Sequence, residues 1–433
     1  MKSKFLLINP WIYDFSAVNL WSRPLGLLQV AEYLSQYDID IHLIDCTDIY
    51  KTNRQYGTGK FPRKIIDKPD ILQAVPRNFA RYGINTDEFK SLLKKYAPFD
   101  MVFVTSVMTY WYPGVLKAIE MVRDIYPYVP VILGGIYASL YEKHAVHHSG
   151  ADYVYTGPIN SAMVKIMRNF GLELIKKNEP IPYYKMGLYR SYPFAPLMTS
   201  KGCPYHCSYC ASSSLFQGFV QRTPSEVIDE ITELYSMGVR DFAFYDDALF
   251  VNADSHIKVI LREVLNSDMN VRFHCPNGVH ARFIDNDLAK LLIRSGFTTL
   301  RISLETVDSG RQAETGGKIT SVTFQESIQS LKAAGFSKEH TGVYLMYGLP
   351  GQDLAEVKEG ITFLQDLNVR INLTEFSPIP HTQCWDDLIE RGIMDTNIDP
   401  LLTNNSVFSA LYQGYDWQEL EALKNSVRNY NSS

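Results

Sequence analysis

Residues 201–210 read Lys-Gly-Cys-Pro-Tyr-His-Cys-Ser-Tyr-Cys, so three of the chain's six cysteines fall within eight positions. Cys203, Cys207 and Cys210 have the spacing C-x3-C-x2-C, and no fourth cysteine lies nearby. Three thiolates can hold a cubic iron–sulfur cluster and leave one iron open to a substrate or cofactor. Structural zinc with His206 as a fourth ligand is an alternative, although such sites usually pair two short ligand hooks.

A helix–turn–strand pattern repeats in the chain after this loop. The clearest helix opens at Thr223 to Glu226, a capping box with proline at the first helical position. Later helices end at Gly296 and Gly335, and an apolar strand follows each of them. The repetition predicts an α/β architecture, a partial (β/α)6 TIM-type barrel over residues 195–388. We expect a short helical tail with a frayed end over residues 389–433.

Residues 1–160 alternate short apolar strands with helical patterns, which predicts a Rossmann-like, doubly wound parallel sheet. Residues 49–98 are polar and interrupt the pattern, so we interpret them as an insertion. Residues 161–194 have the pattern of a helix followed by a linker rich in proline and tyrosine.

The bulk properties limit the possible partners and compartments. The 433 residues carry a formal charge of -5 and are 46% hydrophobic, which provides for two or three domains with substantial cores. Mild acidity gives no general attraction to nucleic acid or membranes, and no apolar run is long enough to span a bilayer. The apolar stretch at residues 5–9 is too short for a signal peptide. We therefore expect a cytoplasmic protein with no nucleic-acid or membrane partner, in a reducing compartment.

The cysteine loop resembles the cluster motif of the radical S-adenosylmethionine (SAM) superfamily, including Tyr209 and the Gly202–Pro204 lead-in. The resemblance implies a [4Fe–4S] cluster on Cys203, Cys207 and Cys210, whose open iron binds SAM. An electron from the cluster, supplied by a donor such as flavodoxin or ferredoxin, then cleaves SAM reductively. The resulting 5′-deoxyadenosyl radical removes a hydrogen atom from the substrate, and the protein binds, orients and excludes water.

The same resemblance implies SAM contacts at three strand ends. Asp246 and Asp247 occupy the position of the motif for the methionyl ammonium, although a helix N-cap or a turn is an alternative role. Gly348, in a Gly-Leu-Pro-Gly turn, corresponds to a backbone platform for adenine.

Ser303 and Glu305 resemble the segment that binds the ribose hydroxyls or the methionyl carboxylate. For Glu305 the alternative is a salt bridge with Arg282 or Arg301. The sequence assigns no residue a catalytic role.

Residues 1–160 also resemble the cobalamin-binding domain that precedes many radical SAM cores. The D-x-H-x-x-G motif that supplies a histidine to cobalt in cobalamin mutases is absent, and residues 46–60 contain no histidine. Cobalamin would therefore bind with its base detached; the alternative is a domain that kept the fold and lost the ligand. The candidate cobalamin-binding residues follow strands and are small: Thr105, Ser106, Gly134 and Gly135.

Together these features predict a cobalamin-dependent radical SAM methyltransferase that acts on an unactivated carbon or phosphorus centre. The substrate would be a small molecule or a peptide. The alternative within enzymes is radical oxidation, cyclisation or rearrangement without methyl transfer. A tRNA methylthiotransferase would have further N-terminal cysteines and a basic terminal domain, and a non-enzymatic iron–sulfur or zinc protein is a third class.

Overall fold

The computed structural model describes residues 2–48, 55–178, 186–317 and 319–433. The chain divides into two compact units, Met1–Tyr192 with Pro400–Leu402 and Pro193–Asp399 with Thr403–Ser433. Parts of the predicted insertion (49–54) and of the predicted linker (179–185) lie outside the described residues. None of the described helices has the length and apolar character that a bilayer span requires.

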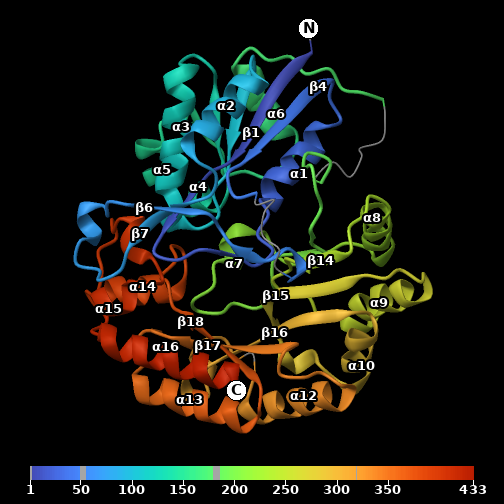
Figure 1. Ribbon diagram of the computed structural model, residues 1–433, viewed down its shortest axis with the longest axis vertical. Helices are drawn as coiled ribbons and strands as arrows, with labels where there is room; N and C mark the ends of the chain where they lie inside the picture. Colours follow the sequence, from blue (N-terminus) through green and yellow to red (C-terminus); the bar gives the residue numbers. More distant parts are fainter. Residues whose placement is uncertain (1, 49–54, 179–185, 318) are drawn as a thin grey trace. The chain divides into compact units, whose positions relative to one another are not determined.

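The first unit is built on a five-stranded parallel sheet in the order β10-β9-β8-β1-β4 (Figure 1). Its strands are β1 (Ser3–Asn9), β4 (Ile39–Asp45), β8 (Met101–Val104), β9 (Val131–Leu133) and β10 (Tyr153–Val154). Phe5 and Leu7 are fully buried on one face of β1, where α1 and α6 complete the core. Leu6 and Ile8 are equally buried on the other face, so β1 is covered on both sides. The predicted Rossmann-like sheet is confirmed.

Helices alternate with these strands, as a parallel sheet requires. They are α1 (Leu25–Leu34), α2 (Thr86–Tyr96), α3 (Tyr112–Ile125), α4 (Ile136–Leu140), α5 (Glu142–His148) and α6 (Ser161–Asn169). The predicted linker thus begins with α6, whose Met163 and Met167 are buried in the first unit's core.

The predicted insertion contains regular structure. Its strands are β5 (Gly59–Lys60), β6 (Arg63–Ile66) and β7 (Phe79–Tyr82), and α2 follows them. β7 and β5 pair antiparallel with two short strands from the start of the chain, β2 (Ile12–Asp14) and β3 (Val18–Asn19), and β6 pairs antiparallel with β7, which gives the orders β2-β7-β6 and β3-β5.

The second unit contains a six-stranded parallel sheet in the order β11-β14-β15-β16-β17-β18. Its strands are β11 (Ala195–Leu197), β14 (Asp241–Phe244), β15 (Arg272–His280), β16 (Phe297–Glu305), β17 (Thr341–Tyr347) and β18 (Arg370–Glu375). The order has two ends, at β11 and β18, so the sheet is a partial barrel. The predicted fold class is confirmed for this unit as well.

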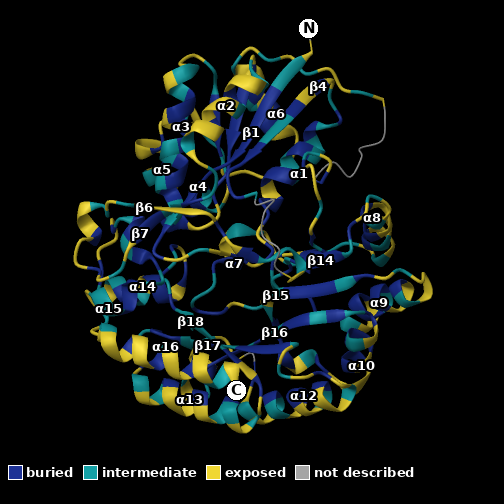
Figure 2. Ribbon diagram, in the orientation of Figure 1, coloured by how far each residue is buried: buried dark blue, intermediate teal, exposed yellow. Residues whose placement is uncertain are grey.

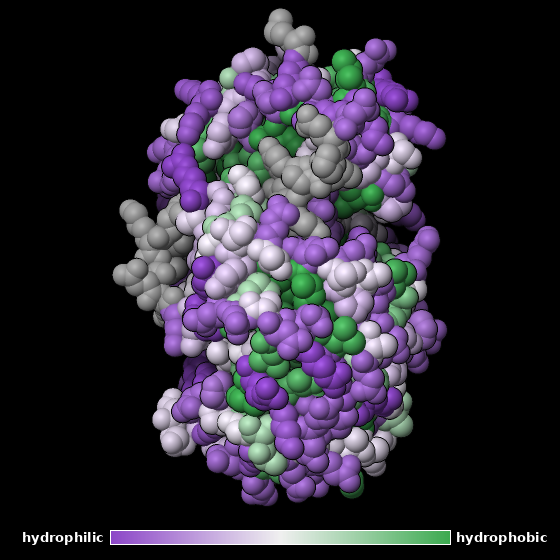
Figure 3. Space-filling view, turned by 90° about the vertical axis from the view of Figure 1, so that its right-hand side faces the viewer, coloured by the Kyte–Doolittle hydropathy of each residue, from purple (hydrophilic) through white to green (hydrophobic). Residues whose placement is uncertain are grey.

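Helices cover the outside of this half-barrel, and Figure 2 shows their exposed faces turned away from buried strands. They are α8 (Pro224–Ser236), α9 (Ile257–Asn266), α10 (Asn286–Arg294), α12 (Ser321–Ala334) and α13 (Leu354–Asp366). Two short helices, α7 (Ser212–Leu215) and α11 (Ser309–Glu314), lie in the loops after β12 and β16. The predicted capping box is present, because Thr223 and Glu226 each accept a hydrogen bond from the other's backbone. The face drawn in Figure 3 is mostly hydrophilic, with smaller apolar areas between the polar side chains.

The end of the chain is not frayed, which corrects the sequence prediction. After α14 (Gln383–Glu390) and α15 (Phe408–Tyr412), helix α16 runs from Trp417 to Ser432. The Asn431 side chain accepts a hydrogen bond from the Ile371 N–H (3.0 Å) and donates one to the Ile371 carbonyl (2.8 Å). This amide therefore pairs with the open edge of β18 as a neighbouring strand would, which fixes the terminal helix.

Candidate functional site

The three cysteines lie on a loop at the start of the half-barrel. A short hairpin, β12 (Ser200–Lys201) with β13 (Val220–Gln221), frames the loop, and α7 follows it. Cys207 is buried, Cys203 and Cys210 are partly exposed, and the Cys210 N–H donates to the Cys207 carbonyl (3.0 Å). Gly202 has φ +75° at the loop's entrance, where a Cβ would lie 2.1 Å from the Gly218 carbonyl oxygen. Only glycine fits there.

The surroundings of the cysteine loop fit a cluster. A Cβ on Gly316 would lie only 3.2 Å from Cys207 Sγ, so this glycine leaves space beside the thiol. In the part of the chain that the structure describes, no group of three His, Cys, Asp or Glu side chains surrounds a single ion. Zinc needs such a group, whereas cubane thiolates each bind a different iron. The zinc alternative therefore has no support in the described residues.

Tyr209 connects the cysteine loop to the end of β16. Its hydroxyl donates to Glu305 Oε1 at 2.9 Å, which joins two residues that the sequence separately predicts to contact SAM. Glu305 has φ +63°, a left-handed conformation that is strained for a residue with a side chain, and the β16–β17 register shifts beside it. Neither Arg282 nor Arg301, both described, forms an ion pair with Glu305; Arg282 donates instead to the Gly317 carbonyl.

Ser303 lies on the same strand, where a second irregularity brings β15 close. A Cβ on Gly278 would lie 2.1 Å from Ser303 Oγ, and the β15–β16 register shifts between Cys275 and Val279. Irregularities of this kind redirect side chains near active sites. Ser303 and Glu305 are thus both at distorted strand ends.

Asp246 is a positioning residue for the cysteine loop. Its carboxylate accepts hydrogen bonds from Thr199 N–H (3.1 Å), Thr199 Oγ1 (2.7 Å) and Ser200 Oγ (2.7 Å), just before the loop begins. Burial raises the pKa of Asp246, although these donors oppose the shift. Its oxygens are therefore already engaged within the protein, which leaves little room for the predicted contact with an ammonium group.

Asp247 is more accessible than its neighbour. Among the described residues its side chain accepts one hydrogen bond, from Ser212 Oγ at 2.6 Å, and burial raises its pKa. It thus ties the first turn of α7 to the end of β14, and it keeps more acceptor capacity than Asp246.

Gly348 ends β17 with φ +82° and lies against α15. A Cβ there would lie 2.1 Å from Ser409 Oγ, so the position requires glycine. Ser409 Oγ and the Gln413 amide atoms are buried without a hydrogen-bond partner among the described residues. Such groups are costly to bury, and no local sequence pattern indicated them.

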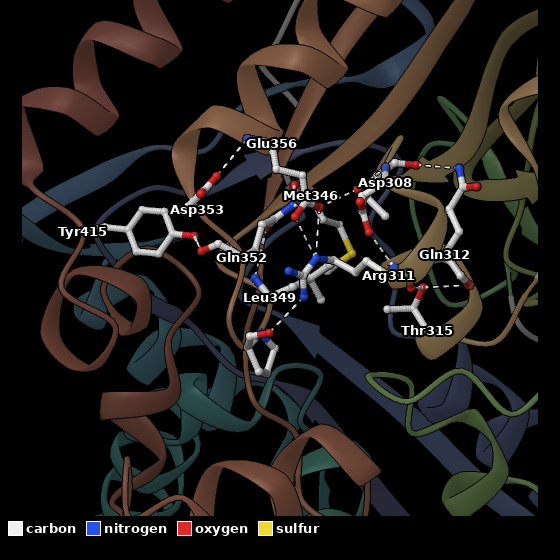
Figure 4. A network of polar contacts seen from close by, with 12 residues as sticks. Asp308, Arg311, Gln312, Thr315, Met346, Leu349, Gln352, Asp353, Glu356 and Tyr415 are labelled. Atoms are coloured by element: carbon white, nitrogen blue, oxygen red, sulfur yellow. Dashed lines mark hydrogen bonds and ion pairs between the residues drawn. The ribbon is translucent and has the colours of Figure 1, made fainter.

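A polar network braces the turn that follows Gly348, and Figure 4 shows its members converging on Glu356. Glu356 accepts from Arg311 Nε (3.0 Å), Thr306 Oγ1 (2.6 Å) and Gln352 Nε2 (3.0 Å). Arg311 also donates to the Pro350 carbonyl (2.9 Å). The network ties the loop after β16 to the turn after β17, which holds two of the predicted SAM segments in a fixed relation.

Aromatic side chains support the cysteine loop from β15. The Tyr205 ring stacks on His280 with 4.8 Å between ring centroids, and Phe283 lies beside both. The Arg282 guanidinium lies 5.3 Å from the Tyr205 ring centroid.

In the first unit, the four predicted small residues lie together at the carboxyl ends of β8 and β9. Ser106 Oγ donates to the Gly134 carbonyl (3.2 Å) and accepts from the Tyr137 N–H (3.1 Å). Gly135 has φ +92°, and a Cβ there would lie 2.4 Å from the Ser106 carbonyl oxygen and 2.9 Å from Thr105 Oγ1. Val107 and Met108, which follow directly, are large apolar side chains that remain exposed. A closely packed small-residue edge with exposed apolar neighbours fits a bulky ligand with apolar faces.

A buried ionic network lies at the ends of β1 and β4, and no sequence pattern predicted it. Asp45 accepts from Asn9 Nδ2 (2.7 Å), Thr47 Oγ1 (2.8 Å) and the Tyr189 hydroxyl (2.7 Å). Arg23 lies 3.8 Å from Asp45 and 2.7 Å from Asp48. These residues are far apart in sequence, so only the fold reveals the network.

The fold and the site define an α/β protein with a three-cysteine loop at the start of a parallel half-barrel. Residues 197–364 match the family model of the radical SAM superfamily. The match lies within the second unit and confirms the resemblance drawn from the cysteine loop.

Curated relatives cover the chain to different extents. An uncharacterized methyltransferase of Pyrococcus horikoshii is 28% identical over 238 residues, which are 52% of this chain and 50% of that protein. The chain thus matches half the length of this relative. The cytidylyl-2-hydroxyethylphosphonate methyltransferase of Streptomyces wedmorensis is 20% identical over 465 residues, covering 90% of this chain and 83% of that protein.

Two solved structures of the radical SAM methyltransferase TsrM from Kitasatospora setae resemble the chain, each with a TM-score of 0.67 at 17% identity. One contains a tryptophan substrate and a SAM analogue and is covered to 76%; the other contains cobalamin and a [4Fe–4S] cluster and is covered to 75%. Each match covers 90% of this chain. At this identity the likeness shows the fold alone.

Proposed function

We propose that this enzyme methylates an unactivated carbon or phosphorus centre, with a [4Fe–4S] cluster, SAM and cobalamin as cofactors. One observation carries the proposal: a single chain joins a radical SAM half-barrel to a Rossmann-like unit in the fold of TsrM, whose structure contains both cobalamin and the cluster. The phosphonate methyltransferase relative, aligned over 90% of this chain, supports the same reaction class.

Cys203, Cys207 and Cys210 would hold the cluster, and the small residues after β8 and β9 would admit cobalamin. When bound, the cluster supplies the electron that cleaves SAM, and cobalamin supplies a carrier for the methyl group. The chain's own part is positioning: Asp246 fixes the entry to the cysteine loop, and Tyr209 joins that loop to Glu305. Glu356 and Arg311 hold the Gly348 turn, where a backbone platform for adenine would lie.

A small molecule or peptide would be the substrate, and a flavodoxin or ferredoxin the electron donor. The test is anaerobic reconstitution of the full chain with cobalamin and methyl-labelled SAM, followed by mass spectrometry of the cobalamin fraction. We expect label on cobalamin together with 5′-deoxyadenosine formation once substrate is supplied. Cobalamin that never acquires label would refute the proposal.

A matched pair of glycine variants tests the cobalamin site. Gly135→Ala would force a Cβ against Ser106, whereas Gly171 also has a positive φ (+78° against +92°) but its added Cβ would meet no atom within 4 Å. We expect G135A to weaken cobalamin binding at least tenfold in a spectrophotometric titration, and G171A to match the parent chain. Equal affinities would place the ligand elsewhere.

A further inference from the structure

The inner face of strands β16–β18 carries polar side chains that the proposed SAM contacts do not use. A Cβ on Gly360 of α13 would lie 2.7 Å from Leu345 Cδ1, so Leu345 faces the covering helices. Because strand side chains alternate, Tyr344 points to the barrel interior and Gly342 belongs to the same face. The register places Arg301 beside Gly342, and Gly342 beside Arg370.

Arg301 is a half-buried guanidinium without an anionic partner. Its one hydrogen bond within residues 2–48, 55–178, 186–317 and 319–433 is long, from Nη1 to the Leu300 carbonyl (3.3 Å). Burial lowers the pKa of Arg301, and the positive charge of Arg370 adds to the effect. In contrast, Arg311 in Figure 4 contacts Glu356, and Arg272 contacts Asp241.

Gly342 makes room for this group. A Cβ at this position would lie 2.9 Å from Arg301 Nη1 and 2.4 Å from Asn372 Oδ1, so both side chains converge on the space that glycine leaves. Asn372 Oδ1 is buried and has no hydrogen-bond partner among the described residues. Tyr344 is fixed beside it by a hydrogen bond from its hydroxyl to the Pro276 carbonyl (2.5 Å).

An unpaired charge and an unpaired amide inside a protein both cost free energy, and a ligand that pairs with them removes the cost. We propose that Arg301, with Arg370 nearby, forms a subsite inside the half-barrel for an anionic oxygen group of the substrate, a carboxylate or a phosphate. The guanidinium fork matches both groups. The Asn372 amide oxygen would accept a hydrogen bond from a neighbouring hydroxyl or N–H of the same molecule. This inference rests on the proposed function, since it assigns the substrate of that reaction.

The test measures anion binding directly and needs no turnover. Inorganic phosphate and acetate are titrated separately into the reconstituted full chain with saturating SAM, which keeps the probes out of the SAM site. Binding is followed by phosphorus and proton line broadening. The variants are Arg301→Gln, Arg301→Lys and, as a matched control, Arg294→Gln on the exposed end of α10.

We expect saturable binding of at least one probe, with the tighter probe identifying the group. R301Q should raise its Kd about tenfold or more, because a charge-assisted pair is lost. R301K should fall between R301Q and the parent chain, and R294Q should match the parent. The inference is overturned if neither probe saturates or if R301Q binds as tightly as the parent. Labelling of cobalamin is measured independently of anion binding. The proposed methyl transfer and the proposed anion subsite can therefore each fail without the other.

Discussion

A buried aspartate follows a parallel strand in each unit, and the two differ in what surrounds them. Asp45, at the end of β4, accepts from Asn9, Thr47 and Tyr189 and lies 3.8 Å from the Arg23 guanidinium. Asp246, after β14, accepts only from neutral groups of Thr199 and Ser200, and burial raises its pKa.

The difference indicates that the carboxyl ends of the two sheets suit different kinds of ligand. In the first unit the charged groups at the strand ends contact one another, since Arg23 lies beside both Asp45 and Asp48, and small and apolar residues remain for a ligand. In the second unit Asp246 accepts from neutral donors only, and Arg301 has no counter-charge among the described residues. The charge of Arg301 is therefore available to complement an anionic ligand. This contrast suits a bulky cofactor in one unit and the charged groups of SAM and substrate in the other.

The largest effect is expected from a substitution in the cysteine loop, because it would remove the cofactor site of the second unit and leave the first unit unchanged. Cys207→Ala should reduce bound iron from about four per chain to near zero after reconstitution and abolish SAM cleavage. Cys46→Ser, a buried thiol of the first unit, should leave iron content unchanged. Iron analysis and 5′-deoxyadenosine formation measure both; full iron retention in C207A would exclude this residue as a ligand.

Asp45→Ala should destabilise the first unit by about 4 kcal/mol, because it removes one partner of a buried ionic network. The Arg23 guanidinium keeps Asp48, but Asn9, Thr47 and Tyr189 lose their acceptor. Hydrogen exchange followed by mass spectrometry resolves the two units and should show faster exchange in β1 and β4. Unchanged protection there would mean that the network contributes little.

Asp246→Ala should lower the free energy of unfolding of the second unit by about 2–3 kcal/mol. The loss is smaller than for Asp45→Ala, because only neutral donors are left without an acceptor. Asp247→Ala is the matched control, since it deprives only Ser212 of an acceptor and should cost about 1 kcal/mol or less. D246A should also lower the yield of reconstituted cluster, since the loop entrance loses its anchor. If D247A were the more damaging of the pair, Asp246 would not be the positioning residue.

These contacts show why the sequence predicts one part of the site and not the other. The cysteine spacing, the Thr223 capping box and the glycines after helices are local signals, and the structure contains each of them. Asp246 meets Thr199 across 47 positions, and Tyr209 meets Glu305 across 96. Such partners depend on strand order and register, which one sequence does not specify. The strained φ of Glu305 is likewise a consequence of its fixed neighbours.

The smallest expected effect is on the pH dependence of stability, and it comes from a buried histidine of the half-barrel that contacts charged side chains. His274 is fully buried, and its Nε2 lies 2.9 Å from Asp241, which also pairs with Arg272. Burial lowers the pKa of His274, although Asp241 opposes the shift. In the unfolded chain the imidazole takes up a proton near pH 6.5, so below that pH the unfolded state binds more protons than the folded state.

The free energy of unfolding of the second unit should therefore fall as the pH decreases below about 6.5, and level off below the folded pKa of His274. His274→Gln should remove up to about 1.4 kcal/mol per pH unit of that slope, whereas the exposed His147→Gln in the first unit should leave it unchanged. Denaturant unfolding at pH 7.5, 6.5 and 5.5 measures the slope. Asp241 titrates in a separate window, because His274 and Arg272 hold its pKa low against the effect of burial, and its contribution is lost only in stronger acid. A slope that persists in H274Q would assign the pH dependence to other groups and leave the Asp241–Arg272 pair as the stabilising element.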